Sequence, residues 1–319
     1  MIPLGPGPEF DRIRRLVAAL GPQAGPVGDD CAVLAWPGGA LVLSVDLAVE
    51  GVHFRRDWLS LREIGWRATA AALSDLAAEA AVPVGLLTSL GLPAGASEAE
   101  LDELARGIGA AAEAAGTAVL GGDLSRADRL IVDVVAVGRA ERPVSRAGAR
   151  PGDGLWVSGT LGGARAALAA FLAGREPDPE ARRALAHPVP RLALGRALAR
   201  AGARAMLDLS DGLGGDARHL AAASSVRLTV DLAGLPVAPA AAAEAAAAGL
   251  PPPVFAALGG EDYELLAALP PEFGPEQARA VERETGVPLV RIGEVAAGTG
   301  VAFRLDGAEL SLKGYDHFA

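Results

Sequence analysis

The stretch GDDCAVLAWPGGALVLSVD, residues 28–46, indicates how the first part of the chain folds. Two apolar runs, 31–36 and 40–46, flank the triplet PGG, which is a turn signal between two strands. Asp30 lies in the glycine loop before the first run, and Asp46 ends the second run. We therefore predict a β-hairpin with a carboxylate on either side of it.

The same pattern recurs along the chain, in both of its halves. Short apolar runs lead into carboxylates in AVLGGD at Asp123, in MLDLSDG at Asp208 and Asp211, and in FAALGGED at Glu261 and Asp262. Each of these alone can be explained by a turn or a helix N-cap, because Asp beside Ser or Gly commonly makes either. Their joint recurrence favours one shared site, since loop carboxylates beside glycines hold hard cations and phosphates in α/β proteins.

Asp75 is a different case, because it lies inside a predicted helix. The helix begins at the capping box formed by Ser60 and Glu63, and Asp75 follows in the apolar segment AAALSDLAAEAA. An isolated carboxylate is costly to bury among alanine and leucine. We therefore expect Asp75 to have a cation as its partner.

The rest of the sequence alternates between helical and strand patterns. Ser97 and Glu100 form a second capping box, which begins a helix that ends at Gly116. Besides this helix and the one that begins at Ser60, helices are predicted at 10–20, 162–173, 191–200, 213–223 and 238–248. Strands are predicted at 84–92, 117–120, 130–138, 155–158, 203–209, 226–232, 263–269, 289–295 and 301–305. The linker-like segment RAGARPGDG begins at Arg146. A chain of 319 residues is too long for one ordinary core, so we predict two α/β domains, 1–147 and 148–319.

Composition excludes several classes of protein. A net charge of -10 makes nucleic acid a poor partner. No secretory signal and no apolar run of roughly 18 residues is present, so no membrane partner is expected. The single cysteine, Cys31, is expected in the core and fits a reducing cytoplasm. The four histidines are too scattered for a zinc motif, and we predict His219 to be an ordinary residue of a helix surface.

The scarcity of lysine limits how a nucleotide could be bound. Lys313 is the only lysine, and neither a Walker loop nor the protein-kinase set of motifs occurs. A bound triphosphate would therefore be neutralised mainly by metal ions on Asp, with help from arginine. Many carboxylates with few histidines favour Mg²⁺.

The segments GDDCAVL, SVDLAVEGVHF, LSDLAA, GGD, SRAGARPGD, LDLSDGL, GGEDYEL and KGYDHF together resemble the thiamine-monophosphate kinase family, in order and nearly end to end. The family belongs to the wider aminoimidazole ribonucleotide synthetase-like superfamily. The resemblance implies a two-domain fold of mixed sheets flanked by helices, a homodimer whose N-terminal sheets pair, and a cytoplasmic enzyme. The implied reaction is the ATP-dependent phosphorylation of thiamine monophosphate to thiamine diphosphate, the last step of its biosynthesis.

The resemblance also implies roles for particular residues. The ligands of several Mg²⁺ ions would be Asp30, Ser44, Asp46, Asp75, Asp123, Asp208, Asp211 and the backbone carbonyl of Val45; the nucleotide contacts would be Gly122, Asp123, Arg146 and Ser210; the contacts to thiamine monophosphate would be His53, Glu261 and Tyr315. Catalysis would rest on Asp30, Asp46, Asp75, Asp123 and Asp211. The family commonly has Ser or Thr where this chain has Val45, so a side-chain hydroxyl role is excluded there.

The chemistry implied by the resemblance needs no strong general base. The acceptor is a phosphate monoester whose second pKa is about 6, so its oxygen is largely anionic at neutral pH. We expect direct in-line transfer. Two alternatives stay open: another ATP-using member of the superfamily, acting on a formylglycinamidine ribonucleotide, a selenide or a carbamoyl group, and a non-catalytic nucleotide- or metal-binding regulator. Selenide and hydrogenase-maturation chemistry would each need a terminal cysteine, which the chain lacks.

Overall fold

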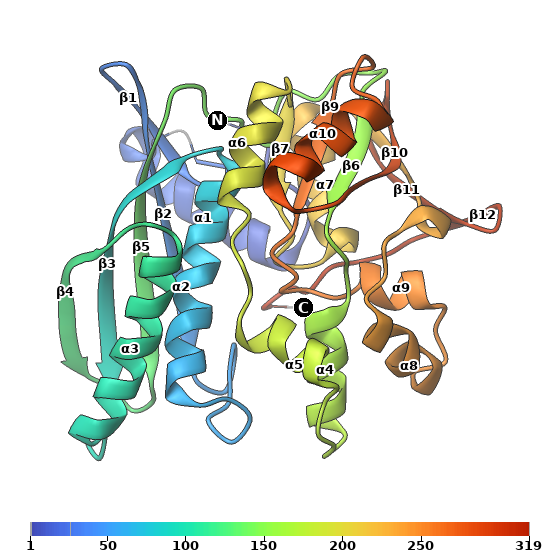
Figure 1. The fold of residues 1–319 in the computed structure, drawn as a ribbon. Helices are drawn as coiled ribbons and strands as arrows, with labels where there is room; N and C mark the ends of the chain where they lie inside the picture. Colours follow the sequence, from blue (N-terminus) through green and yellow to red (C-terminus); the bar gives the residue numbers. More distant parts are fainter. Residues whose placement is uncertain (1, 26, 319) are drawn as a thin grey trace.

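The computed structural model describes residues 2–25 and 27–318 and contains two mixed β-sheets (Figure 1). The first sheet has five strands in the order β1-β2-β5-β3-β4: β1 (Ala32–Trp36), β2 (Gly39–Val49), β3 (Val82–Leu92), β4 (Val119–Arg126) and β5 (Ile131–Ala140). Its neighbours pair antiparallel except β3 and β4, which run parallel. The hairpin predicted from the opening stretch is confirmed as β1 and β2, with Trp36 opposite Gly39.

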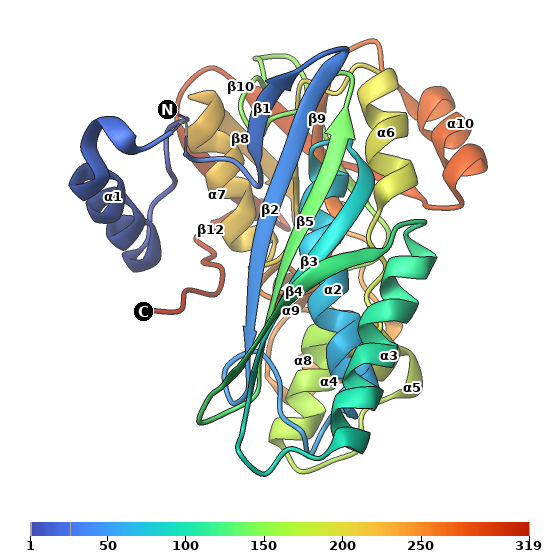
Figure 2. The same cartoon turned by 90° about the vertical axis from the view of Figure 1, so that its left-hand side faces the viewer.

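Two helices cover one face of this sheet and leave the other bare. The helices α2 (Leu61–Ala78) and α3 (Glu98–Ala114) begin at the two predicted capping boxes, which are both formed. Figure 2 shows the opposite face of the sheet toward the viewer, and no helix of the described chain crosses it. Residues alternate accordingly: Val42 and Val134 are buried, whereas Val45 and Leu87 are exposed. We call this bare side the open face.

The second sheet has seven strands in the order β12-β11-β8-β10-β6-β9-β7. Its strands are β6 (Gly154–Ser158), β7 (Ala205–Asp208), β8 (Arg227–Asp231), β9 (Leu265–Leu269), β10 (Leu289–Ala296), β11 (Gly300–Leu305) and β12 (Ala308–Leu310). The helices of this half are α4 (Gly163–Leu172), α5 (Pro179–Ala186), α6 (Leu192–Arg200), α7 (Leu213–Ser224), α8 (Pro239–Ala247), α9 (Pro252–Ala257) and α10 (Pro275–Thr285). Every residue of β6, β7 and β9 is buried, as expected for strands enclosed on both faces.

Helix α2 joins the two halves. It packs on β2 and β5 of the first sheet and also on α6 and β7 of the second half. One apolar core therefore runs across the junction and includes Val42, Leu76 and Met206. The predicted boundary at 147/148 falls in the segment between the two sheets. Helix α1 (Pro8–Leu20) lies to one side of the first sheet, near the C-terminal end of the chain (Figure 2).

Several predictions about local structure are wrong. Asp46 and Asp123 lie inside β2 and β4 and not at strand ends, because pairing with β5 and β3 continues past them. Glu261 follows helix α9 and precedes β9, so no strand leads into it. The helices α5, α9 and α10 and the strand β12 were not predicted. Within residues 2–25 and 27–318, no helix is both long and apolar enough to cross a membrane.

Candidate active site

Three carboxylates from distant parts of the sequence meet where the halves join. Asp30 lies in the loop before β1, Asp75 lies on α2, and Asp208 ends β7. One carboxylate oxygen of each lies within 4.8 Å of the others. We call these three residues the acidic triad. The hydroxyl of Ser44 on β2 donates a hydrogen bond to Asp75, which connects the triad to the first sheet.

The triad carries negative charge that the protein only partly balances. Burial raises the pKa of Asp30 to about 7, against the lowering effect of Arg146, and burial raises the pKa of Asp208 to about 6. Burial and then the charges of Asp208 and Asp30 raise the pKa of Asp75 well above its ordinary value. The arrangement is therefore unfavourable for three ionised carboxylates without a cation.

The cation expected beside Asp75 is not a protein side chain. No Lys or Arg in the part of the chain that the structure describes forms an ion pair with Asp75. The Oδ2 atom of Asp30 is buried and has no hydrogen-bond partner among the described residues. Three convergent oxygen donors with such an unpaired atom fit a hard divalent cation such as Mg²⁺.

Strand β2 brings two more of the predicted ligands to the edge of this cluster. Asp46 is half-buried, and burial raises its pKa to about 6 against the lowering effect of Arg67. Because β1 pairs with β2 only from Gly39 to Leu43, the far edge of β2 beyond Leu43 has no strand partner in the described chain. The side chain of Val45 is 66% exposed on the open face, so only its backbone can serve the site.

Arg146 lies beside the triad and not free in a linker. Its guanidinium donates to Asp30, and its backbone N–H donates to Asp29 Oδ1 at 3.0 Å. Burial disfavours its charged form, but Asp30 and Asp29 outweigh that effect and raise the pKa of Arg146. Ser224 Oγ donates to its carbonyl at 3.1 Å and fixes the backbone. Arg146 is thus a held positive charge in an otherwise acidic site.

Two loops of the second half run side by side and carry Ser210, Asp211 and Glu261. The backbone N–H of Glu261 donates to the carbonyl of Ser210 at 2.7 Å, and that of Tyr263 donates to Leu209 at 2.9 Å. Gly212 has a φ of 96°, and a Cβ there would lie 2.5 Å from the carbonyl oxygen of Gly259, so the close approach requires glycine. Glu261 and Tyr263 have φ values of 68° and 50°, a strained conformation that is typical of functional loops.

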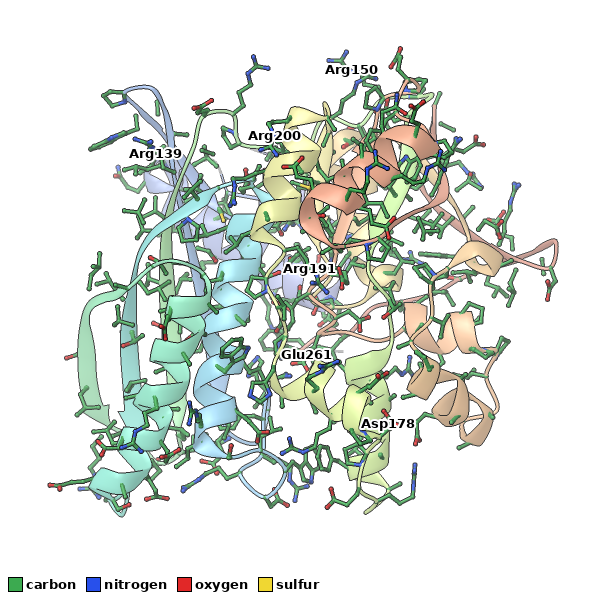
Figure 3. The ribbon with its side chains drawn as sticks, viewed as in Figure 1. Arg139, Arg150, Asp178, Arg191, Arg200 and Glu261 are labelled. Atoms are coloured by element: carbon green, nitrogen blue, oxygen red, sulfur yellow. The ribbon has the colours of Figure 1, made fainter. Side chains whose placement is uncertain are left out.

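The three predicted substrate residues gather on one side of this loop pair. The ring of His53 lies 4.9 Å from that of His317, which lies 4.9 Å from Tyr315 in an edge-on arrangement. The backbone N–H of Tyr315 donates to the carbonyl of Asp211 at 3.0 Å. Glu261 lies between the two halves (Figure 3). One wall of the candidate active site is thus formed by a C-terminal segment, a loop after β2 and the loop that carries Glu261.

Arg67 is a functional residue that the sequence analysis missed. Its guanidinium is buried and donates to Glu261, to the carbonyl of His53 and to the carbonyl of Leu185 at 2.8 Å. Arg67 precedes Asp75 by two helical turns on α2, and an arginine at the start of the alanine-rich stretch of this helix was the signal available. It orients two predicted substrate residues at once.

Asp262 points away from Glu261 although the two are consecutive. Both of its carboxylate oxygens accept from the backbone N–H of Gly162, each at 3.0 Å. Asp262 also lines a cavity of about 480 Å³ together with Trp66, His187 and Arg191. Asp262 therefore supports the start of α4 and does not join the acidic triad.

Asp123 and Gly122 do not reach the triad within one chain. Along the paired strands, Leu47 lies opposite Asp133, Asp133 opposite Ser89, and Ser89 beside Asp123. Directly paired residues share a face of the sheet, so Asp123 lies with Leu47 on the open face, about 14 Å away across three strand spacings. Asp123 belongs to neither group of potential metal ligands in the described chain.

The prediction that His219 lies on a helix surface is wrong. His219 is 8% exposed on α7, and its ring stacks on Phe10 at 4.1 Å. Burial, with the charges of Arg146 and Arg218, lowers the pKa of His219 to about 4. The N-terminal segment that covers it could not be foreseen from the helical pattern of α7.

The comparison with known proteins agrees with this architecture. The family model of AIR synthase related protein, N-terminal domain, matches residues 28–140, and that of the C-terminal domain matches residues 150–306. The fold and the acidic site thus define an AIR synthase related protein.

Individual relatives narrow this class. The thiamine-monophosphate kinase of Halobacterium salinarum is 38% identical over 95% of this chain and 99% of its own, and that of Escherichia coli is 36% identical over 97% and 96%. The solved structure of AaThiL complexed with AMPPCP and TMP superposes with a TM-score of 0.87 at 33% identity, over 97% of each chain. The chain belongs to the thiamine-monophosphate kinase family.

Proposed function

We infer that this protein is a kinase that transfers the γ-phosphate of ATP to thiamine monophosphate and forms thiamine diphosphate. The observation that carries this inference is the convergence of Asp30, Asp75 and Asp208 beside a wall of predicted substrate residues. The likeness to a structure bound to an ATP analogue and TMP supports it over 97% of the chain. A single cysteine and the use of ATP favour the cytoplasm as its location.

We further propose that the acidic residues bind magnesium. Asp30, Asp75 and Asp208 supply the inner oxygens, with Asp46, Asp211, Ser44 and the carbonyl of Val45 at the margin. Bound Mg²⁺ would neutralise the triphosphate and hold the two phosphates close together. The partnerless Oδ2 atom of Asp30 supports this assignment independently of the family.

Arg146 and Ser210 are proposed to bind the nucleotide phosphates. Arg146 already carries a fixed positive charge next to the triad, and its backbone is held by Asp29 and Ser224. A planar guanidinium suits phosphate oxygens. When a triphosphate binds, Arg146 can exchange its bond to Asp30 for one to phosphate, which frees that carboxylate for a cation.

His53 is suited to donate a hydrogen bond to the phosphate of thiamine monophosphate. The backbone N–H of Val49 donates to His53 Nδ1 at 3.1 Å, so the proton of the neutral ring is on Nε2. Burial, together with His317, lowers the pKa of His53 and keeps the ring neutral at physiological pH. Its Nε2–H is therefore a fixed donor and not a proton acceptor.

Glu261 and Tyr315 are proposed to bind the rings of the substrate. Arg67 fixes the carboxylate of Glu261, which can accept from the aminopyrimidine. Tyr315 is 55% exposed, and its electron-rich face suits a cationic thiazolium. Since the acceptor oxygen is already anionic near neutral pH, these residues need only position it for direct transfer.

We propose that two copies pair through the open face, which would also supply Asp123. Apolar residues line this face in register: Val45 and Leu87 are exposed, and the half-buried Val135 lies opposite both. A bare apolar sheet face is unfavourable in water. Asp123 and Gly122 of one copy would then complete the nucleotide site at the free edge of β2 in the other.

Purified heterodimers test this arrangement. One copy carries Asp123→Asn and the other carries Asp75→Asn, and each homodimer serves as a control. If Asp123 acts across the interface, one of two sites is intact and the heterodimer shows about half of wild-type turnover, as two-fold symmetry requires. Turnover no higher than that of the homodimers would place Asp123 in its own chain.

The substrate is tested by measuring ADP and thiamine diphosphate together. With ATP and Mg²⁺, thiamine monophosphate should give one thiamine diphosphate for each ADP, whereas free thiamine and purine-pathway intermediates should give neither. ADP release with only the purine-pathway compounds would assign the chain another activity of the superfamily. Tight ATP binding without any turnover would make it a regulator.

A further inference from the structure

The C-terminal segment, residues 312–318, crosses the start of helix α7 before it reaches the substrate wall. Arg218 on α7 donates to the carbonyl of Leu312 at 2.6 Å. A Cβ on Gly314 would lie 2.6 Å from the Cα atom of Gly215, so only glycine allows the two backbones to come this close. Helix α7 therefore holds the first half of the segment.

The side chains of the second half make contacts of two kinds. The rings of Tyr315 and His317 lie 4.9 Å apart, and the ring of His317 also lies 4.9 Å from that of His53. Asp316 and Phe318 instead contact helix α1, which lies beside this end of the chain (Figure 2). Helix α1 therefore holds the two residues that flank His317.

Asp316 supplies a cap that α1 lacks in its own sequence. The N-cap residue of α1 is Gly7, which has no side chain to accept a hydrogen bond, and Pro8 has no N–H to donate. The first free backbone donor is that of Glu9, which donates to Asp316 Oδ2 at 3.3 Å. A carboxylate at this end of a helix is also favoured by the helix dipole.

The contact is close and uses both carboxylate oxygens of Asp316. A Cβ on Gly7 would lie 2.8 Å from Oδ2, and its φ of 139° also favours glycine there. Oδ1 accepts from the backbone N–H of Phe318 at 2.8 Å. The guanidinium carbon of Arg12 on α1 lies 4.2 Å from the centre of the Phe318 ring. These contacts join α1 to both neighbours of His317.

We propose that Asp316 is a positioning residue for thiamine monophosphate: by capping α1, it holds Tyr315 and His317 in place beside the substrate. This inference rests on the proposed function, in which Tyr315 and His53 contact the substrate. Because both of its oxygens accept from backbone N–H groups, Asp316 acts through the segment and not on the substrate itself. In the described chain, no hydrogen bond joins α1 to the acidic triad or to Arg146.

Steady-state kinetics with thiamine monophosphate and ATP varied in turn test the proposal. Asp316→Ala should raise KM for thiamine monophosphate about fivefold, the effect of one lost hydrogen bond, and should leave kcat and KM for ATP unchanged. Asp316→Asn keeps an oxygen acceptor and should restore most of the loss. Asp11→Ala is the matched control, because Asp11 lies in the first turn of α1 but pairs with Arg14, so KM should not change.

Gly7→Ala tests the same contact from the other side and without substrate. Its added methyl group would push against Asp316, so residues 312–318 should lose protection from amide hydrogen exchange. Measured by mass spectrometry, their exchange should become about tenfold faster than in the wild-type protein. Exchange in α2 should stay unchanged, which shows that the fold is intact.

Three results would overturn the proposal. Exchange of residues 312–318 in Gly7→Ala could match the wild-type protein. KM for thiamine monophosphate could stay unchanged in Asp316→Ala, or kcat and KM for ATP could change as strongly, as a merely structural role predicts. The proposed function is judged separately: no turnover of thiamine monophosphate by the wild-type protein would contradict that function, whereas normal turnover with unchanged exchange in Gly7→Ala would contradict this inference alone.

Discussion

Replacing Asp208 by Asn should make the metal-free protein more stable and the enzyme far less active. Asp208 ends β7 and contributes to the acidic triad, where burial raises its pKa from 3.8 to about 6. When folding raises the pKa of a carboxyl group, its ionisation destabilises the folded state. The full effect is present at pH values above the pKa in the folded state, and it vanishes below the pKa in the unfolded state. The effect should therefore develop between pH 4 and 6.

The magnitude follows from the two pKa values. The difference between 3.8 and about 6 corresponds to about 3 kcal/mol at neutral pH. Asn is still a buried polar group, so the expected gain is smaller, about 1–3 kcal/mol. Added Mg²⁺ should stabilise the wild-type protein, because an ion that binds only the folded state raises its stability. The same Mg²⁺ should stabilise Asp208→Asn much less.

Thermal unfolding with and without a chelator measures both effects. At pH 7.5 with chelator, Asp208→Asn should unfold a few degrees above the wild-type protein, and at pH 4 the two should coincide. Asp128→Asn, at an exposed position, is the matched control. It should change neither the unfolding temperature in chelator nor the stabilisation by Mg²⁺. The reasoning is refuted if Asp208→Asn is less stable than wild type in chelator at pH 7.5, or if Mg²⁺ stabilises both equally.

Three further predictions concern the site and the interface. Asp75→Asn should lower turnover by a factor of about 100 or more, since losing a metal ligand removes about 3 kcal/mol of charge stabilisation; near-normal turnover would contradict the triad. His53→Ala should raise KM for thiamine monophosphate about tenfold, whereas His53→Gln should raise it less because Gln keeps a hydrogen-bond donor. Equal KM values for the two variants in steady-state kinetics would exclude a hydrogen bond from His53 to the substrate. Leu87 is 42% exposed in the single chain and would be buried in the proposed dimer. Leu87→Glu would bury a carboxylate there, so this variant should sediment as a monomer. An unchanged sedimentation profile would exclude pairing through the open face.

Local signals in the sequence predicted the elements that depend on local interactions. The capping boxes at Ser60 and Ser97 and the hairpin of β1 and β2 form as predicted, because each is decided by residues close together in the chain. The ends of β2 and β4 were not predictable in this way. Asp46 and Asp123 continue their strands because distant partners, β5 and β3, keep pairing with them.

The candidate site was predicted in part for a related reason. Recurring carboxylates in glycine-rich loops identified Asp30 and Asp208, and the apolar helix around Asp75 identified Asp75; the fold brings all three together. The face on which Asp123 lies depends on strand register, and the burial of His219 depends on Phe10 from the N-terminal segment. Such contacts join residues far apart in sequence and leave no periodic signal in either segment.

Anomalous diffraction from a crystal grown with Mn²⁺, a non-hydrolysable ATP analogue and thiamine monophosphate tests the central claim most directly. The claim predicts a metal peak bonded to Asp30, Asp75 and Asp208, with phosphate oxygens of the nucleotide completing its coordination. Both substrates bound in the cleft with no metal peak among these three carboxylates would contradict it.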